Sequence, residues 1–533
     1  MEAKELKELK AGTVAQPENP LETQSHGDNS AKNPLPESKS IGPLRSISAG
    51  TGTPDSKSPK PYPKTEERKE IETVAFSNAW VTLGLYGILT ITDHIIWISF
   101  WPIMSRGQEY FGVGSVAIFM LSIIYVIDFI LFAPAAGQRV DRKGLRHGVL
   151  VGAFLMFFGS LIKVAPAPFK MNGIVGYVFV FLGHFVGGIA HCFILILPPK
   201  LAQNWFRPHE RVTAQAICTI LNQLGITIGI FLTPFIGGEE RISLLLLIHF
   251  VLSLLVLIVE LIFFVGESPK PPSLSTTCDP GGSSRRQPQT FLGSFSQLWK
   301  TTKSLIHVPG FFLTSMSVGV GMGAYYAIWL LLSLHDMMST TDAIVEVNAL
   351  LIYNLAGVIG AITAALSIDR WGSQHRSTVF ITFIGFAMSL LVFSLSIIQG
   401  NRAFIAICCA VMGIFGTALP PTSTDLIMEI TFPAPQATTN AIALVIGQIW
   451  TLIFIFGSLE MKNHYAPALS LALGTFVAVF AFGVTNNKNY KRRRYESQAR
   501  HGIRGQMTEQ TGVDQRVMDG QYATRFFTLG NPS

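Results

Sequence analysis

Hydrophobic and polar positions along the chain separate into long apolar runs and short polar intervals. Each run has about 20 residues, enough to cross a hydrocarbon core roughly 30 Å thick at 1.5 Å per residue. Because lipid offers backbone groups no hydrogen-bond partner, such runs predict membrane-spanning helices and exclude a closed barrel. The twelve runs lie at 78–101, 114–136, 148–165, 174–197, 211–236, 242–265, 309–334, 345–367, 378–398, 402–427, 436–459 and 465–484.

A polar interval at 267–305 divides the runs into two sets of six. The pattern predicts an all-α membrane protein with two six-helix halves, 76–266 and 306–486, joined by a linker. The remaining segments, 1–75 and 487–533, are predicted to be disordered tails, because the first is rich in Pro, Ser, Lys and Glu and has too few apolar residues to form a core.

Composition supports a membrane location. The chain is 49% hydrophobic and only 14% charged, whereas soluble proteins carry about 25% charged residues. The net charge of +7 reflects basic residues in tails and loops, so orientation explains it better than nucleic-acid binding. We expect the lipid bilayer and a small-molecule substrate as partners, no nucleic acid, and a monomer. The five cysteines show no metal-binding spacing, so no metal or cofactor is expected.

Basic residues also predict the orientation. Loops on the side of the tails hold nine Lys and Arg besides five in the linker, and the opposite loops hold six. The positive-inside rule therefore places both termini and the linker in the cytosol. We expect the plasma membrane, with an endomembrane as the alternative.

The two halves carry matching motifs. A D-R-x-G sequence follows the second run at Asp141, Arg142 and Gly144, and another follows the eighth run at Asp369, Arg370 and Gly372. Leu-Pro-Pro before the fifth run, 197–199, likewise recurs before the eleventh, at 419–421. Two matches at a similar offset indicate an internal duplication.

Twelve runs in two repeats, with G-x-x-x-D-R-x-G-x-R between the second and third, resemble the major facilitator superfamily. The motif residues are Gly137, Asp141, Arg142, Gly144 and Arg146. The resemblance implies two six-helix halves and a gating role for this motif. Gly permits close helix approach, and the carboxylate near a helix N-terminus forms a charge latch with the arginines.

A narrower resemblance is to the feline leukaemia virus subgroup C receptor-related family. It is carried by the segments 121–125, 197–200, 222–225, 323–326 and 429–433. Members carry small organic cations, among them choline and ethanolamine, and have been linked to haem export, so the resemblance implies a facilitator of such solutes. Asp93 stands where the choline carriers have Asn.

Asp93 is the first candidate for the substrate site. A charge inside a span costs about 3 kcal/mol on insertion scales, so it suggests a function. Trp97 lies at i+4 on the same helix face, and a carboxylate with an indole suits a cation. The alternative is that Asp93 pairs with a Lys or His within the bundle.

Polar and aromatic residues of other spans complete the candidate site. Gln223 and Gln448 are at equivalent positions of the fifth and eleventh runs, so pseudo-symmetry places both near the central axis, unless they serve interhelical hydrogen bonds. Tyr326 matches a cage tyrosine of the resembled family, and its neighbour Tyr325 is the second aromatic candidate, with packing as its alternative role.

Two carboxylates suggest a different mechanism. Asp425 and Glu429 are one turn apart in the tenth run, where desolvation and mutual repulsion favour proton uptake. They, or Asp93, are the proton-coupling candidates, and capping of a helix end is the alternative.

The leading hypothesis is an alternating-access carrier of an organic cation such as choline or ethanolamine, with haem as a further substrate. A proton-coupled carrier of another metabolite is the alternative within transport, and a receptor or channel is the alternative class. An enzyme is not expected, because the chain has no H-E-x-x-H, nucleophile elbow or phosphate loop.

Overall fold

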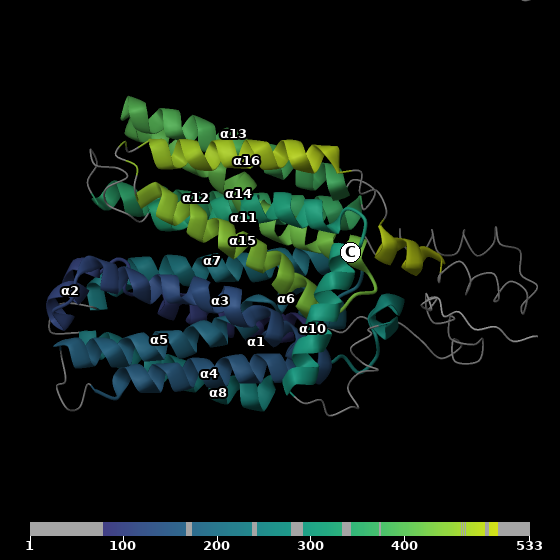
Figure 1. Ribbon diagram of the computed structural model, residues 1–533, viewed down its shortest axis with the longest axis horizontal. Coiled ribbons are helices and arrows are strands. Elements are labelled where there is room, and N and C mark those ends of the chain that lie inside the picture. Colours follow the sequence, from purple (N-terminus) through teal and green to yellow (C-terminus); the bar gives the residue numbers. More distant parts are fainter. Residues whose placement is uncertain are drawn as a thin grey trace, which may run out of the picture. The chain divides into compact units, whose positions relative to one another are not determined.

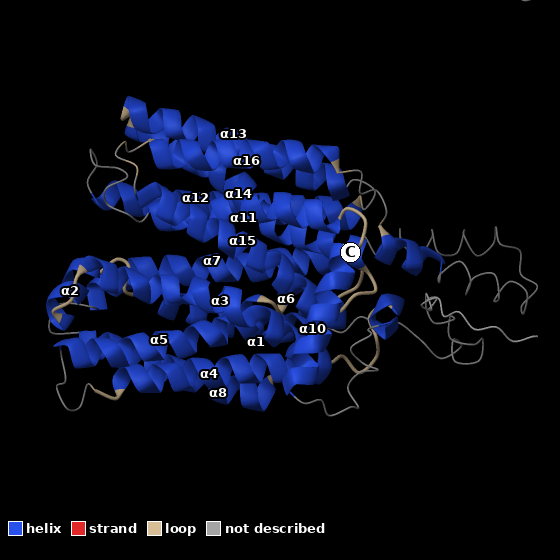
Figure 2. Ribbon diagram, in the orientation of Figure 1, coloured by secondary structure: helices blue, strands red, loops and turns tan. Residues whose placement is uncertain are grey.

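The computed structural model describes residues 78–166, 173–236, 242–278, 291–332, 343–371, 375–459, 461, 463, 465–485 and 490–498. Helices form this described part, with no strand in it (Figure 2). Twelve helices are long and apolar enough to cross a membrane. They are α1 (Asn78–Ile98), α3 (Ser115–Lys143), α4 (Leu145–Val164), α5 (Gly173–Leu195), α7 (Arg211–Ile236), α8 (Ile242–Phe263), α11 (Phe311–Leu332), α12 (Ala343–Arg370), α13 (His375–Gln399), α14 (Arg402–Thr431), α15 (Gln436–Leu459) and α16 (Ala466–Val484).

The first six spanning helices pack in the same way as the last six. In the first set α1 contacts α7, α3 contacts α5, and α4 contacts both α5 and α8. In the second set α11 contacts α15, α12 contacts α14, and α13 contacts both α14 and α16. The pattern of contacts therefore repeats, as the sequence duplication predicts. Figure 1 shows the two sets on opposite sides, with α7 and α15 along their boundary.

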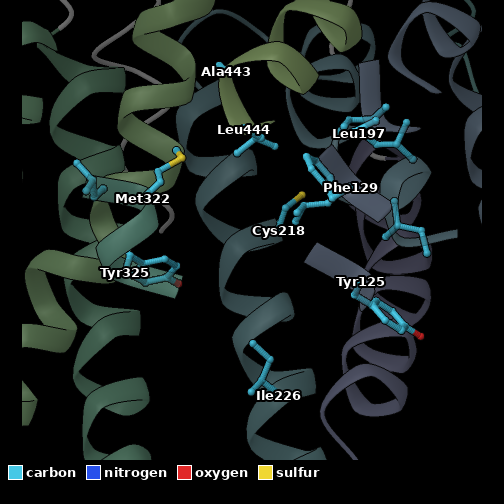
Figure 3. Packing of buried hydrophobic residues seen from close by; sticks show 14 of the residues in the cluster. Tyr125, Phe129, Leu197, Cys218, Ile226, Met322, Tyr325, Ala443 and Leu444 are labelled. Atoms are coloured by element: carbon cyan, nitrogen blue, oxygen red, sulfur yellow. The ribbon is translucent and has the colours of Figure 1, made fainter. Parts of the chain in front are cut away.

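Three pairs of spanning helices join the sets. α3 packs on α15, and α7 packs on α12 and α14. Side chains of both sets belong to one buried cluster, in which Tyr125 and Phe129 lie on one side and Met322, Tyr325 and Leu444 on the other (Figure 3). The two sets therefore share one buried cluster.

Several helices were not predicted from hydropathy. They are the short helices α2 (Met104–Phe111) and α6 (Pro198–Trp205), and α10 (Phe291–Ile306) in the linker. α10 runs across the helix ends and contacts α3 and α11 (Figure 1). We call this end of the bundle, which also carries residues 490–498, the linker end.

Other differences concern the segments between and beyond the runs. Residues 491–498 are helical, although composition predicts a disordered tail from 487. The tail 1–75, linker residues 279–290 and residues 499–533 lie outside the described residues.

Candidate functional site

The first D-R-x-G motif ends α3 and contacts the other half. Asp141 accepts hydrogen bonds from the backbone N–H groups of Ala437 at 3.1 Å and Thr438 at 2.8 Å, and from the Thr438 hydroxyl at 2.7 Å. These groups belong to the first turn of α15, whose N–H groups have no partner within the helix. Lys200 lies 3.5 Å from the same carboxylate. Asp141 thus caps a helix of the second half and is itself charge-paired.

The second motif makes the equivalent contact in the reverse direction. Asp369, at the end of α12, accepts hydrogen bonds from the N–H groups of Val212 at 3.2 Å and Thr213 at 2.8 Å, and from the Thr213 hydroxyl at 2.7 Å. These residues form the first turn of α7. Two carboxylates therefore join the halves at the linker end. Each lies at the N-terminus of a helix, which is the positive end of the helix dipole.

The other residues of the first motif shape the contact. A side chain on Gly137 would lie 2.7 Å from the Ala437 carbonyl oxygen, so only glycine permits the approach of α3 to α15. Gly144 has φ +90°, and it is the single residue between α3 and α4. Arg146 donates to the Leu261 carbonyl at the end of α8.

The D-R-x-G motifs lie mostly within helices and not in turns, because α3 continues through Arg142 to Lys143 and α12 ends at Arg370. Gly372 lies outside the described residues.

A cavity lies between the halves. Its larger lobe holds about 640 Å³ of empty space, counting the part open to solvent. The first half lines it from α1, α7 and the α5–α6 junction, and the second half from α11, α14 and α15. The polar and aromatic lining residues are His94, Trp97, Gln215, Thr219, Asn222, Gln223, Tyr325, Tyr326, Thr424 and Asn440.

A smaller lobe adjoins the larger one, with which it shares His94, Trp97, Leu195 and Tyr326. Its other lining residues are Tyr125, Val126, His191, Gln448 and Thr451. The sequence-predicted residues Trp97, Gln223, Tyr325, Tyr326 and Gln448 therefore all line one lobe or both. The two glutamines enter from α7 and α15, the equivalent helices of the halves.

Hydrogen bonds and ring contacts fix the aromatic wall. Trp97 donates its indole N–H to the Ser122 carbonyl at 3.0 Å, which leaves the ring faces for other contacts. The rings of Tyr325 and Tyr326 meet edge to face with centroids 5.2 Å apart. The amide oxygens of Gln223 and Gln448 have no hydrogen-bond partner among the described residues. A buried acceptor without a hydrogen bond costs free energy, and a donor on a bound solute would remove that cost.

Asp93 does not line the cavity, which corrects its expected place in direct contact with substrate. It is 1% exposed, and its Oδ2 atom lies 2.6 Å from Nδ1 of His191 in α5. His191 stands between Asp93 and the smaller lobe, and its ring lies 5.8 Å from that of Trp97. This geometry agrees with the alternative expectation, in which Asp93 pairs with a Lys or His within the bundle.

The donor atoms of Asp93, His94 and His191 all lie within 4.8 Å of one another, close enough for a metal ion to be considered. The distances favour hydrogen bonds instead. Two ligands held at about 2.05 Å and a right angle are roughly 2.9 Å apart, whereas the Asp93–His191 contact is 2.6 Å. In addition, Nδ1 of His94 lies 2.8 Å from the Thr90 carbonyl, to which it donates.

Asp425 and Glu429 form an ion cluster at the linker end and are not themselves lining residues of the cavity. Asp425 nevertheless accepts a hydrogen bond of 3.1 Å from the lining residue Gln215. Arg492 lies 2.7 Å from a carboxylate oxygen of each, and the backbone N–H of Arg493 donates to Glu429 at 3.1 Å. Burial lowers the pKa of the Arg492 guanidinium, but the two carboxylates outweigh burial and raise it above its usual range. The cluster therefore joins α14 to residues 490–498.

The helix that carries Arg492 also reaches the first half. Glu496 lies 3.0 Å from Arg211, the first residue of α7, and accepts a hydrogen bond of 2.5 Å from the Ser275 hydroxyl of the linker. Burial raises the pKa of the Glu496 carboxyl, but Arg211, Ser275 and Arg492 together more than offset burial, so this pKa lies below its usual range. We call residues 490–498 the C-terminal strap, because they connect α14, α7 and the linker.

Sequence reasoning did not find His94, His191, Asn222 or the strap. His191 is 98 positions from Asp93, and neither has a local pattern that reveals the other. Arg492 and Arg493 belong to a basic run that is also typical of a topology anchor.

Comparisons with known proteins agree with this geometry. A "Uncharacterized MFS-type transporter" of Caenorhabditis elegans is 28% identical over 435 residues, covering 78% of this chain and 71% of that protein. The choline/ethanolamine transporter flvcr2a of Danio rerio is 27% identical, covering 76% of this chain and 85% of that protein. The human choline/ethanolamine transporter FLVCR2 is 24% identical, with 72% of each chain covered.

Solved structures show the same fold. The transporter FucP in its outward conformation aligns with a TM-score of 0.58 at 15% identity, covering 77% of this chain and all of that chain. The family model of the Major Facilitator Superfamily matches residues 84–455. Together with the twelve spanning helices, this match shows that the chain belongs to the Major Facilitator Superfamily and is a multi-pass membrane transporter, not an enzyme.

Proposed function

We propose that this transporter carries a small organic cation of the choline and ethanolamine class. The observation that carries the proposal is the chemistry of the cavity. Its described lining combines the aromatic rings of Trp97, Tyr325 and Tyr326 with the amides of Gln223 and Gln448, and it includes no Asp, Glu, Lys or Arg. A ring face attracts an ammonium group by about 0.5 to 2 kcal/mol, and amides serve the hydroxyl of such a solute without the cost of a buried charge.

The proposed mechanism is alternating access. The Asp141 and Asp369 contacts and the strap join the halves at the linker end. These contacts must break before the cavity can open there. Rocking of the halves about the cavity would then expose it to each side in turn.

The test is uptake by the purified full-length protein in proteoliposomes. Labelled choline, ethanolamine and haem are offered with and without a pH gradient. We expect saturable choline or ethanolamine uptake that needs no gradient. Transport of haem alone, or of none of the three, would contradict the proposal.

Matched variants assign the uptake to the cavity. Tyr326→Ala removes a lining ring, whereas Phe480→Ala removes a ring that is 77% exposed on the outer face of α16. Uptake should fall only in the first. Equal uptake by both variants would place the binding site elsewhere.

A second candidate function is proton-coupled transport of another metabolite. The observation that favours it is the buried Asp93–His191 contact beside the cavity. In that case uptake of a different solute would follow the imposed pH gradient, and choline would not compete.

For the orientation, we propose that the linker end and both termini face the cytosol. We also propose that the protein is a monomer and lies in the plasma membrane. The excess of basic residues in the loops on the cytosolic side supports this orientation. A cysteine introduced in the linker should resist an impermeant thiol reagent in intact cells, and should react after permeabilisation. Labelling of intact cells would reverse the orientation.

A further inference from the structure

A buried chain of titratable side chains lies behind the cavity in the first half. The Asp93–His191 contact of 2.6 Å is the end nearest the cavity. The second carboxylate oxygen of Asp93 is buried and has no hydrogen-bond partner among the described residues. When Asp93 is ionised, its carboxylate accepts a hydrogen bond from Nδ1 of His191, and Nε2 is then the basic nitrogen.

Lys163 of α4 is a further buried basic side chain in this half. It is 1% exposed, and its ammonium has no hydrogen-bond partner among the described residues. It interacts electrostatically with Asp93. An isolated charge of this kind is costly in a buried site, so Lys163 and Asp93 stabilise one another only while both are ionised.

Other elements packed around the pair contribute further titratable groups. His94 of α1 lies 3.6 Å from Asp93. The ring centroid of Tyr125, in α3, lies 5.6 Å from that of His191 and 5.9 Å from that of His184. His184 of α5 and His249 of α8 interact electrostatically with Lys163. Asp128 of α3 interacts electrostatically with Tyr125. Asp93 is therefore the carboxylate that contacts the cavity-lining histidines.

We propose that His191, held by Asp93, binds a proton in competition with a cation in the cavity. A proton from water would form a new N–H bond at Nε2, giving an imidazolium paired with the Asp93 carboxylate. This proposal rests on the proposed function, because it concerns the same cavity, and it assigns that cavity a second ligand, the proton.

The geometry makes the two ligands antagonistic. The His191 and Trp97 rings are 5.8 Å apart, and the His94 and Trp97 rings 5.9 Å apart. An imidazolium at the wall therefore repels an ammonium seated on the Trp97 face. Binding linkage is reciprocal, so a cation that enters the cavity weakens proton binding by the same factor and promotes release of the proton. The coupling has the sign of cation–proton exchange, opposite to that of symport.

Lys163 sets how readily the proton binds. Its positive charge near Asp93 opposes a second positive charge on His191. Lys163→Met should therefore extend the competition to higher pH, and Asp93→Asn should abolish it.

Calorimetry on the purified full-length protein tests the competition, with choline as the probe. Titrations in phosphate and in Tris, whose ionisation heats differ, count the protons released on binding. We expect net release of protons, and a Kd that approaches a tenfold rise per pH unit on the acid side. His191→Gln should remove both effects. Asp128→Asn, at another buried carboxylate of the same half, should keep them.

A second measurement does not depend on substrate. An imidazolium close to an indole quenches its fluorescence, so acidification should dim Trp97. The signal is obtained as the difference between the wild type and Trp97→Phe, and Asp93→Asn should flatten it.

The outcomes are distinguishable. Choline binding without proton release and with a pH-independent Kd overturns the proton site but leaves the proposed function intact. If choline and ethanolamine do not bind at any pH, the proposed function fails, and the Trp97 titration then decides the proton site alone. A flat titration overturns it.

Discussion

Asp141 and Asp369 occupy equivalent positions in the two halves, and each accepts two backbone N–H groups and one threonine hydroxyl from the first turn of a helix in the opposite half. The halves are thus joined by two reciprocal caps. Breaking one cap leaves the other in place, so the contribution of each can be measured separately.

Asp141→Asn should destabilise the state that is closed at the linker end by about 2 kcal/mol, because hydrogen bonds to a charged acceptor contribute roughly 1.5 to 3 kcal/mol. Spin-label distances between the halves measure the populations, and a binding assay measures affinity. Asp369→Asn should act similarly. If affinity collapses while the distances and exchange rates stay normal, the residue does not act as a latch.

Gly137→Ala should prevent close approach of α3 to α15, because the new methyl group meets backbone atoms of Ala437 and Thr438 within 3 Å. Gly84→Ala is the control, since a methyl group there meets nothing within 4 Å, and alanine in a helix stabilises by about 1 kcal/mol. The same spin-label distances should widen only in the first variant. Unchanged distances in Gly137→Ala would show that the helices can separate without loss of closure.

Trp97→Ala should weaken choline binding by about 2- to 30-fold, the range that corresponds to 0.5 to 2 kcal/mol of cation–π attraction. Trp97→Phe should lose less, because phenylalanine keeps a weaker ring face although it loses the hydrogen bond to Ser122. Binding constants at pH 8 make the comparison. Equal losses would mean that the shape of the residue matters and its ring charge distribution does not.

The strap should respond to acid only at low pH. The pKa of Glu496 is lowered in the folded protein, so its stabilising effect is complete above the ordinary glutamate value of about 4.3 and is lost as pH falls through the lower folded value. Proteolysis of the strap should therefore stay constant between pH 7 and pH 5.5. Glu496→Gln should expose the strap throughout that range. Release of the wild-type strap near pH 6 would contradict the assignment.

Hydropathy predicted the spans because unpaired backbone groups are costly in lipid, so a long apolar run that crosses the membrane must form a helix. The duplication then located the equivalent pairs Gln223 with Gln448 and Asp141 with Asp369. Asp93 was singled out as a charge inside a span, but its partner was not identified, because His191 meets it through tertiary packing of α1 on α5. The pairing of Arg492 with Asp425 and Glu429 was missed for the same reason.

The two halves contribute unequally to the cavity wall. The histidines of the wall and Asp93 behind them come from the first half, whereas the second half lines the cavity with tyrosine, amide, threonine, proline and leucine side chains. The second half also places Asp425 against the lining residue Gln215. A side chain that carries one unit of charge gains or loses about 2.3 kcal/mol when it crosses 100 mV. Motion of the first half within the membrane field therefore moves these titratable groups with it. A voltage step should produce a transient current whose size depends on whether His191 holds its proton.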